Sequence, residues 1–208
     1  LDETITFMTT PGRLLVVEGI DGCGKSTQAA RIAERLDALA TFEMGATELG
    51  ASIRQLVLGL EHNPSPTAES LLIAADRAQH VAEVIEPTLG TGRHVVSDRF
   101  FASTLAYQGW GRGVPLEDLV VLIELATHGR RPDLTFLFDL PVELAAARRG
   151  AEADRMESEA VEFHQRVRQG YLAQAAAEPE VWVVIDASQS LEAVSSQVDA
   201  ELVRRGWA

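Results

Sequence analysis

Residues Arg13–Thr27 read RLLVVEGIDGCGKST, and this stretch decides the fold. Its central part, Gly19–Ser26, matches the pattern G-x-x-x-x-G-K-[ST] at every fixed position. The apolar run Leu14–Val17 predicts a buried parallel strand before the glycines. The apolar residues after Lys25 are spaced as on one face of a helix. A strand, a glycine loop and a helix in this order form a phosphate loop, so the stretch predicts a nucleoside triphosphate site.

The loop supplies the groups that a triphosphate needs. Its glycines allow backbone conformations in which successive N–H groups point into one concavity, next to the positive end of the following helix. Lys25 is expected to reach the β- and γ-phosphates, and the Ser26 hydroxyl is expected to hold Mg²⁺. An accidental match is rare when both flanking elements are present. The predicted ATP-binding residues are Gly19, Ile20, Asp21, Gly22, Cys23, Gly24, Lys25, Ser26 and Thr27.

Composition limits the remaining possibilities. The 208 residues predict a single domain over 13–208, preceded by a flexible N-terminal extension, 1–12, that lacks the features of a signal peptide. The net charge of −13 argues against general nucleic-acid binding. No stretch approaches the roughly 18 apolar residues of a membrane helix. The single cysteine, Cys23, excludes an internal disulfide and favours a cytoplasmic location.

Strand and helix patterns alternate along the rest of the chain. Further strands are predicted over 41–47, 93–97, 133–140 and 181–185. Helices are predicted over 48–59, 67–86, 100–107, 115–127, 158–177 and 191–205, with another starting at Pro141, and 109–113 is predicted to be a flexible turn. This order predicts an α/β, three-layer phosphate-loop NTPase fold, with a five-stranded parallel sheet and helices on both faces.

Three charged features outside the loop are candidates for the site. Asp98 and Arg99 follow a predicted strand, at the sheet edge where ligands bind, so Asp98 could hold Mg²⁺ and Arg99 a phosphate; a strand-end salt bridge is the alternative. The arginine-rich segment 148–157 has the composition of a short lid whose arginines cover the phosphates, or of a solvated loop. Arg77 lies within an apolar helix pattern, which suits either a ligand in a cleft or a surface pair.

Several segments together resemble bacterial thymidylate kinases, over nearly the whole chain from Arg13 to about Arg205. They are VVEGIDGCGKST, GATELGASIRQLVL, LLIAADRAQHV, SDRFFASTLAYQG, RPDLTFLFDLP, DRMESEAVEFHQRVRQGY and IDAS. The resemblance implies transfer of the ATP γ-phosphate to dTMP with Mg²⁺, giving dTDP, in a homodimer that packs the helices after Thr67 and Pro115.

The resemblance also implies roles for individual residues. Asp21 approaches the 3′-hydroxyl of the acceptor, Arg54 and Arg99 bind its phosphate, and Arg77 contacts the thymine edge. The catalytic set is Lys25, Asp21, Arg99, Asp98 and Arg155, and the metal ligands are Ser26 and Asp98. Arg148 and Arg155 are the lid arginines, with Arg148 on the ATP side. The acceptor pocket comprises Glu43, Arg54, Ile73, Arg77, Arg99, Ser103, Thr104 and Gln108.

Four residues depart from the family pattern on the acceptor side. Phe42 and Met44 replace an arginine and a proline, Ile73 replaces a phenylalanine that stacks on the base, and Ala102 replaces an aspartate. These departures suggest the hypothesis of an altered pocket that prefers another or a modified pyrimidine monophosphate. A phosphate-loop regulatory NTPase, a degenerate kinase retained for binding, and a deoxynucleoside kinase remain the alternatives, although no activated base for the last can be assigned.

Overall fold

The computed structural model describes residues 10–59, 61–148 and 154–207. Five parallel strands form one sheet in the order β2-β3-β1-β4-β5, which confirms the predicted parallel sheet. They are β1 (Leu14–Glu18), β2 (Leu39–Phe42), β3 (Val95–Asp98), β4 (Leu134–Asp139) and β5 (Trp182–Asp186). All five residues of β1 are buried, as expected for a central strand covered on both faces.

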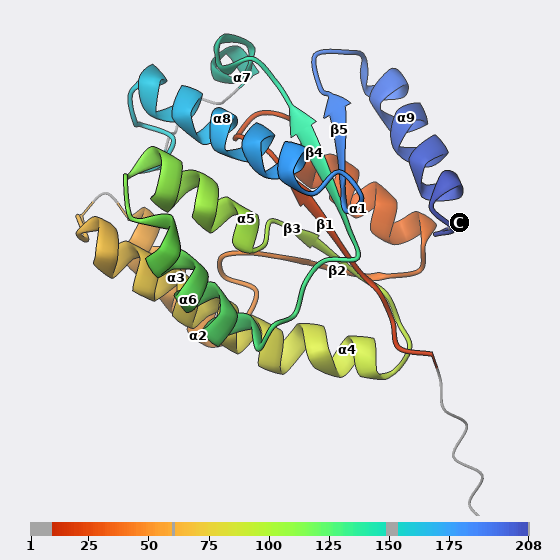
Figure 1. Ribbon diagram of the computed structural model, residues 1–208, viewed down its shortest axis with the longest axis horizontal. Coiled ribbons are helices and arrows are strands. Elements are labelled where there is room, and N and C mark those ends of the chain that lie inside the picture. The colour runs from red at the N-terminus through yellow and green to blue at the C-terminus, as the bar shows by residue number, and fades with distance from the viewer. Residues whose placement is uncertain (1–9, 60, 149–153, 208) are drawn as a thin grey trace, which may run out of the picture.

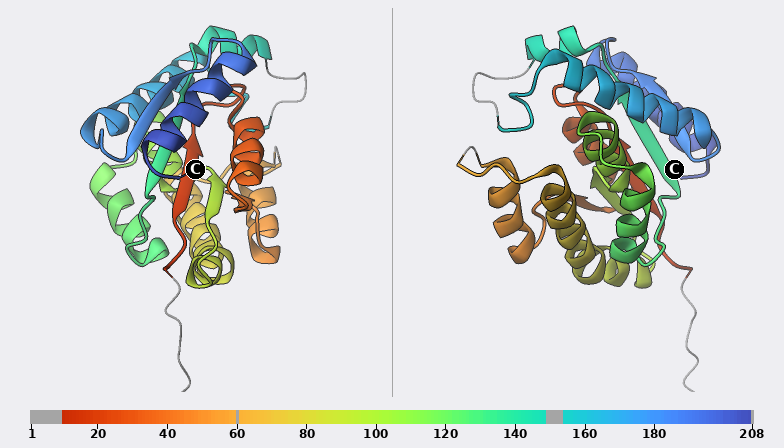
Figure 2. Two further views of the ribbon diagram at one scale, coloured as in Figure 1. Left: turned by 90° about the vertical axis from the view of Figure 1, so that its right-hand side faces the viewer. Right: turned by 60° about the vertical axis from the view of Figure 1, so that its left-hand side comes forward.

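Helices cover both faces of this sheet. Helices α1 and α9 lie on one side, and α5, the π-helical segment η2 and α8 lie on the other (Figures 1 and 2). The helical segments are α1 (Lys25–Arg35), α2 (Glu48–Leu58), α3 (Pro66–His80), η1 (Val81–Ile85), α4 (Glu86–Gly90), α5 (Phe101–Thr104), η2 (Leu105–Gly111), α6 (Leu116–Thr127), α7 (Val142–Arg148), α8 (Val161–Ala177) and α9 (Leu191–Arg204). No helix in these described ranges is long and apolar enough to cross a membrane.

Three strands end at the same level of the sheet. Asp98 at the end of β3 pairs with Val17 of β1 and with Phe42 of β2. The phosphate loop, the turn after Asp98 and the turn after Phe42 therefore leave the sheet side by side. In an open parallel sheet, the carboxyl ends of the strands form the ligand-binding edge.

The predicted helix 67–86 was wrong at its end, because Pro87 does not stop it. Helix α3 continues through the π-helical turn η1 into α4, which ends at Gly90. A proline lacks the N–H that an α-helix interior requires, but it is tolerated in a first turn. The wide turn η1 places Pro87 in the first turn of α4, where the missing donor costs little.

The flexible turn predicted over 109–113 was also wrong. Gly109 and Gly111 belong to η2 and are buried. A Cβ atom on Gly109 would lie 2.5 Å from Leu116 Cδ2, and one on Gly111 would lie 2.5 Å from Phe163 Cε2. These glycines therefore allow close packing of η2 against its neighbours rather than a mobile bend.

Other predicted helix and strand boundaries differ from the observed ones by a few residues. The strand predicted over 41–47 is Leu39–Phe42, and that predicted over 93–97 is Val95–Asp98. The helix predicted over 158–177 begins at Val161. Residues 1–9 of the predicted extension and 149–153 of the predicted lid lie outside the described residues.

Candidate active site

The phosphate loop has the backbone geometry that the motif predicts. Gly19 and Gly22 adopt φ angles of 143° and 89°, in the region that favours glycine. A Cβ atom on Gly22 would lie 2.7 Å from the carbonyl oxygen of Ala145, so a side chain could not be accommodated there. Helix α1 begins at Lys25, which places the positive end of the helix at the loop.

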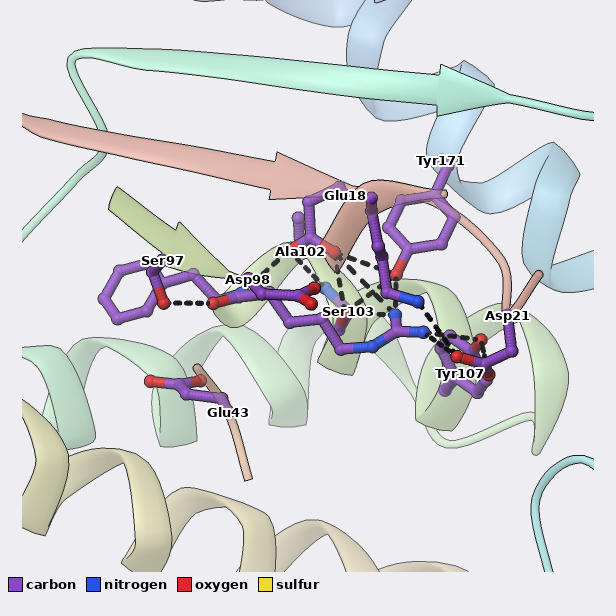
Figure 3. A network of polar contacts seen from close by, with 12 residues as sticks. Glu18, Asp21, Glu43, Ser97, Asp98, Ala102, Ser103, Tyr107 and Tyr171 are labelled. Carbon is purple, nitrogen blue, oxygen red and sulfur yellow. Dashed lines mark hydrogen bonds and ion pairs between the residues drawn. The ribbon is translucent and has the colours of Figure 1, made fainter. Parts of the chain in front are cut away.

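Asp21 joins the loop to the turn after β3. Its Oδ1 atom accepts a hydrogen bond from Lys25 Nζ at 2.9 Å and another from Arg99 Nη2 at 2.6 Å, and its Oδ2 accepts one from the Tyr107 hydroxyl at 2.9 Å (Figure 3). Although burial opposes ionisation, the charges of Arg99 and Lys25 hold the pKa of this carboxyl far below its ordinary value. Asp21 is therefore an ionised carboxylate that holds two cationic side chains in one place.

Glu18 accepts hydrogen bonds from several residues that surround Arg99. This last residue of β1 is fully buried, and it accepts hydrogen bonds from Phe100 N at 2.9 Å, Ser103 Oγ at 2.7 Å and the Tyr171 hydroxyl at 2.9 Å (Figure 3). Burial raises the pKa of the Glu18 carboxyl, while Arg99 and the hydrogen bonds oppose that shift. Sequence reasoning missed Glu18, although a carboxylate at the end of an otherwise apolar buried strand was a visible signal.

Arg99 is held by groups from the phosphate loop and from three helical segments, α5, η2 and α8. Besides Asp21, its Nη1 atom donates to Ser103 Oγ at 3.0 Å and to the Tyr171 hydroxyl at 2.9 Å. Its guanidinium lies over the Tyr107 ring, 5.1 Å from the centroid. Burial raises the pKa of both tyrosines well above the ordinary range, with a further contribution from Asp21 for Tyr107 and from Glu18 for Tyr171, while Arg99 opposes the shift. Both tyrosines therefore act as neutral hydroxyls. Tyr107 and Tyr171 are two further site residues that the sequence did not single out.

Ser26 and Asp98, the two predicted metal ligands, come together. The Ser26 hydroxyl donates to Asp98 Oδ2, and Asp98 Oδ1 is buried with no hydrogen-bond partner among the described residues. A buried carboxylate oxygen without a partner beside a hydroxyl suits a Mg²⁺ site, since hard cations prefer oxygen ligands. Within the described ranges, no group of three or more His, Cys, Asp or Glu side chains could hold a metal. A cation here would complete its ligands with nucleotide oxygens or water.

A cavity lies beside this network. Asp21 and Arg99 of the network line it together with Ile73, Arg77, Thr104 and Gln108. Arg77 is 1% exposed, and its Nε donates to Glu43 Oε2 at 2.8 Å, its Nη1 to Thr104 Oγ1 at 2.9 Å and its Nη2 to the Phe100 carbonyl at 3.3 Å. Arg77 is thus a buried, paired cation at a cavity wall, which excludes the surface-pair alternative.

The four departures from the family pattern fall in different places. Ile73 and Met44 line the cavity, so they change its surface directly. Phe42 is 46% exposed and lines a neighbouring cleft together with Lys25, Ser26 and Asp98. Ala102 is buried and is not among the residues that line the cavity.

The structure does not bring together at the site all of the arginines that were predicted to bind phosphate. Arg54 lines both the cavity and the neighbouring cleft, and its Nη1 donates to the Met44 carbonyl at 2.9 Å. Arg148 Nη1 donates to the Ala187 carbonyl at 3.0 Å. Arg155 Nε donates to the Val57 carbonyl at 2.8 Å, and its Nη2 pairs with Glu69. Arg155 therefore contacts α2 and α3 rather than the phosphate loop in this structure.

Comparison with known proteins places this geometry in one family. The family model described as thymidylate kinase matches residues 17–198. A thymidylate kinase of Prochlorococcus marinus (strain MIT 9313) is 47% identical over 92% of this chain and 94% of its own length. One from Chromobacterium violaceum is 46% identical over 93% of this chain and 94% of its own length. The crystal structure of thymidylate kinase from Ehrlichia chaffeensis superposes with a TM-score of 0.76 at 31% identity, covering 92% of this chain and 99% of that one.

Proposed function

The chain belongs to the thymidylate kinase family, and from this premise we propose that it transfers the γ-phosphate of ATP to dTMP, giving dTDP and ADP. One observation supports this function most strongly. Asp21 of the phosphate loop bonds both Lys25, on the triphosphate side, and Arg99, at the wall of the adjacent cavity. The groups that would meet the two substrates are therefore held by one carboxylate.

The proposed chemistry depends on positioning and charge. A phosphate oxygen of the acceptor attacks the γ-phosphorus of ATP, and the bond from that phosphorus to the β,γ-bridging oxygen breaks, so that ADP leaves with the electron pair. The acceptor is a phosphate monoester that is already anionic at neutral pH, so no strong base is needed. Lys25 and Arg99 stabilise charge on the phosphates, and Asp21, whose pKa is far below neutral, accepts a hydrogen bond rather than a proton.

Ser26 and Asp98 would hold Mg²⁺ together with the nucleotide. When bound, the cation neutralises charge on the ATP phosphates. The unpartnered Oδ1 atom of Asp98 supports this assignment, since such an atom is costly when buried without a ligand. Arg148 and Arg155 are the proposed lid cations, and they would have to leave the contacts described above to reach the phosphates.

A pocket for another or a modified pyrimidine monophosphate is the second candidate, because Ile73 and Met44 line the cavity where the family pattern has a phenylalanine and a proline. Ile73 cannot stack on a base, and such a ring contact contributes about 1 kcal/mol. A coupled assay of ADP release across dTMP, dUMP, dCMP and 5-substituted dUMP distinguishes the two. A low KM for dTMP overturns the altered-pocket hypothesis, and turnover retained in Lys25→Ala overturns the role of the loop.

The outer surface of α3 and α6 supports the homodimer. The two helices pack together, and Leu71, Val121 and Leu125 are 51%, 67% and 71% exposed on them. We propose that a second copy of the chain covers these side chains. Light scattering should give a dimer for the wild type and a monomer for Leu125→Glu. Leu191→Glu on α9, where Leu191 is 63% exposed, is the matched control and should leave the dimer intact.

The proposed location is the cytoplasm, which the single cysteine supports. A fractionation experiment that places the activity elsewhere would contradict it. ATP and a deoxynucleoside monophosphate are the proposed partners, with no nucleic acid, because the net charge of −13 is unfavourable for a polyanionic strand.

A further inference from the structure

Glu69 is a fully buried carboxylate that lies one layer behind the acceptor cavity. It belongs to the first turn of α3 and is 0% exposed. Three side chains donate hydrogen bonds to it: Gln108 Nε2 at 2.8 Å, Arg112 Nε at 3.3 Å, and Arg155 Nη2. Glu69 does not line the cavity, whereas its partner Gln108 does. Any effect of Glu69 on a bound acceptor must therefore pass through another residue.

The contact with Glu69 decides which end of the Gln108 amide faces the cavity. An ionised carboxylate only accepts hydrogen bonds, so the amide must turn its NH₂ group toward Glu69. The guanidinium group of Arg112 neutralises the charge of Glu69, together with that of Arg155 as long as Arg155 keeps the contacts seen in this structure. Gln108 is 1% exposed, and its Oε1 atom has no hydrogen-bond partner within the described parts of the chain. The Oε1 atom of Gln108 is therefore a hydrogen-bond acceptor that is available to a ligand in the cavity.

Arg77 offers the complementary group at the same cavity. Its guanidinium has five N–H donors, and three of them bond Glu43, Thr104 and the Phe100 carbonyl. Two donors remain on the Nη atoms. An acceptor from Gln108 and a donor from Arg77 match a base edge that carries an N–H beside a carbonyl, as in a pyrimidine imide. A 4-aminopyrimidine presents the reverse pattern, with a ring nitrogen that accepts beside an amino group that donates.

We propose that Glu69 is a positioning residue that fixes the orientation of the Gln108 amide and thereby makes the pocket select an imide base over a 4-aminopyrimidine. This inference rests on the proposed nucleoside monophosphate kinase function. Its physical basis is that a buried polar group left facing a like group loses its hydrogen bond at full desolvation cost. Without the carboxylate, either end of the Gln108 amide could face the base.

The test compares kcat/KM for dTMP and dCMP in Glu69→Gln and the wild type. A glutamine at 69 can present either its oxygen or its NH₂ group to Gln108, so the dTMP/dCMP preference should fall about tenfold or more, through the acceptor KM. The KM for ATP should change less than about twofold, since the ATP side does not contact Glu69. Glu159→Gln is the control: it removes the other carboxylate partner of Arg112, has no contact with Gln108, and should preserve the preference.

Two double variants show whether the effect passes through Gln108. In a Gln108→Met background, Glu69→Gln should change the preference no further, because there is no amide left to orient. The exchange Glu69→Gln with Gln108→Glu keeps an acceptor facing the cavity, because both oxygens of a carboxylate at 108 accept hydrogen bonds and the amide at 69 can donate to one of them. It should therefore restore the preference to within about threefold of the wild type. It also tests the idea if Glu69→Gln alone does not fold.

The possible results distinguish a failure of the proposed function from a failure of the positioning role of Glu69. A wild type that phosphorylates no pyrimidine monophosphate overturns the proposed function. A wild type active on dTMP whose preference is unchanged by Glu69→Gln overturns the positioning role. A further loss of preference in the Gln108→Met background, or an exchange variant no more selective than Glu69→Gln, overturns it as well.

Discussion

Replacing Glu18 by glutamine keeps the shape of the side chain and removes one of its two carboxylate oxygens. Oε1 accepts from the N–H groups of Phe100 and Ser103, which cannot turn away. Oε2 accepts from the hydroxyls of Ser103 and Tyr171, which can rotate. The amide should therefore place its oxygen at the Oε1 position and its NH₂ group toward the hydroxyls.

The size of the effect follows from these partners. The Ser103 and Tyr171 hydroxyls lie 2.7 Å apart, so one of them can donate to the other after the exchange. Only one hydroxyl then loses its acceptor, and Glu18→Gln should lower the free energy of unfolding by about 1–2 kcal/mol. Glu18→Met removes both oxygens and leaves the buried Phe100 N–H unpaired, whereas Ser103 N–H keeps its bond to the Phe100 carbonyl at 3.1 Å. With both hydroxyls also deprived of the carboxylate, the total loss should be about 3 kcal/mol.

The difference between wild type and Glu18→Gln should depend on pH. The pKa of Glu18 is raised in the folded state above its ordinary value of 4.5. Its favourable contribution to stability is therefore complete below pH 4.5 and is lost as the pH rises through the raised pKa. Glutamine lacks this dependence, so the gap in unfolding free energy should narrow from pH 4.5 toward neutral pH. Asp21, whose pKa is lowered, loses its contribution only as the pH falls below 3.8, and it is present in both proteins.

Urea unfolding followed by circular dichroism, at several pH values between 4.5 and 8, measures these differences. The hydrogen-bond account of Glu18 fails if Glu18→Met is no less stable than Glu18→Gln. The pH account fails if the gap between wild type and Glu18→Gln widens as the pH rises. Tyr171→Phe is a matched control, because it removes one hydrogen-bond donor to Glu18 but keeps the Glu18 carboxyl group. It should lower the free energy of unfolding by about 1 kcal/mol, and its difference from the wild type should not narrow as the pH rises.

Three further predictions concern other parts of the site. Asp98→Asn should raise the Mg²⁺ concentration needed for half-maximal turnover by about tenfold, measured by metal titration at saturating ATP; an unchanged requirement contradicts Asp98 as a ligand. Arg99→Lys should reduce kcat/KM for dTMP by about 100-fold, since an ammonium cannot reproduce the planar fork that contacts Asp21 and Tyr171; a loss under fivefold contradicts that. Gly111→Ala should lower stability by about 1–3 kcal/mol in thermal unfolding, because the new Cβ meets Phe163, and Phe163→Leu should recover part of the loss.

The phosphate loop could be read from sequence because its chemistry is local. Lys25 and Asp21 are four residues apart, and the strand and helix beside them carry clear periodicity. The meeting of Ser26 with Asp98 was predictable because parallel strands bring their carboxyl ends to one edge. The family resemblance added Gln108, which no spacing rule identifies, and it assigned a role to Arg77, which the apolar helix pattern had already marked.

The missed residues depend on contacts that sequence cannot display. Tyr171 meets Glu18 across 153 positions. Glu18 had a local signal, a carboxylate that ends an apolar strand, but nothing in the sequence connects it with Tyr171. Arg155 was expected over the phosphates, but it pairs with Glu69 on α3, which carried no signal of its own. The continuation of α3 past Pro87 was missed because the π-helical turn before the proline, which makes the proline tolerable, has no recognisable local sequence pattern.

The common level at which β1, β2 and β3 end makes the length of each strand part of the site. Removing one residue from β3 would draw Asp98 and Arg99 back along the sheet by about 3.3 Å and turn them to its opposite face. A deletion in a connection that carries no site residue leaves these strand ends in place. The position of Arg99 relative to Asp21 is thus set by the number of residues in the strand, so insertions and deletions should be tolerated in such connections and not in these three strands.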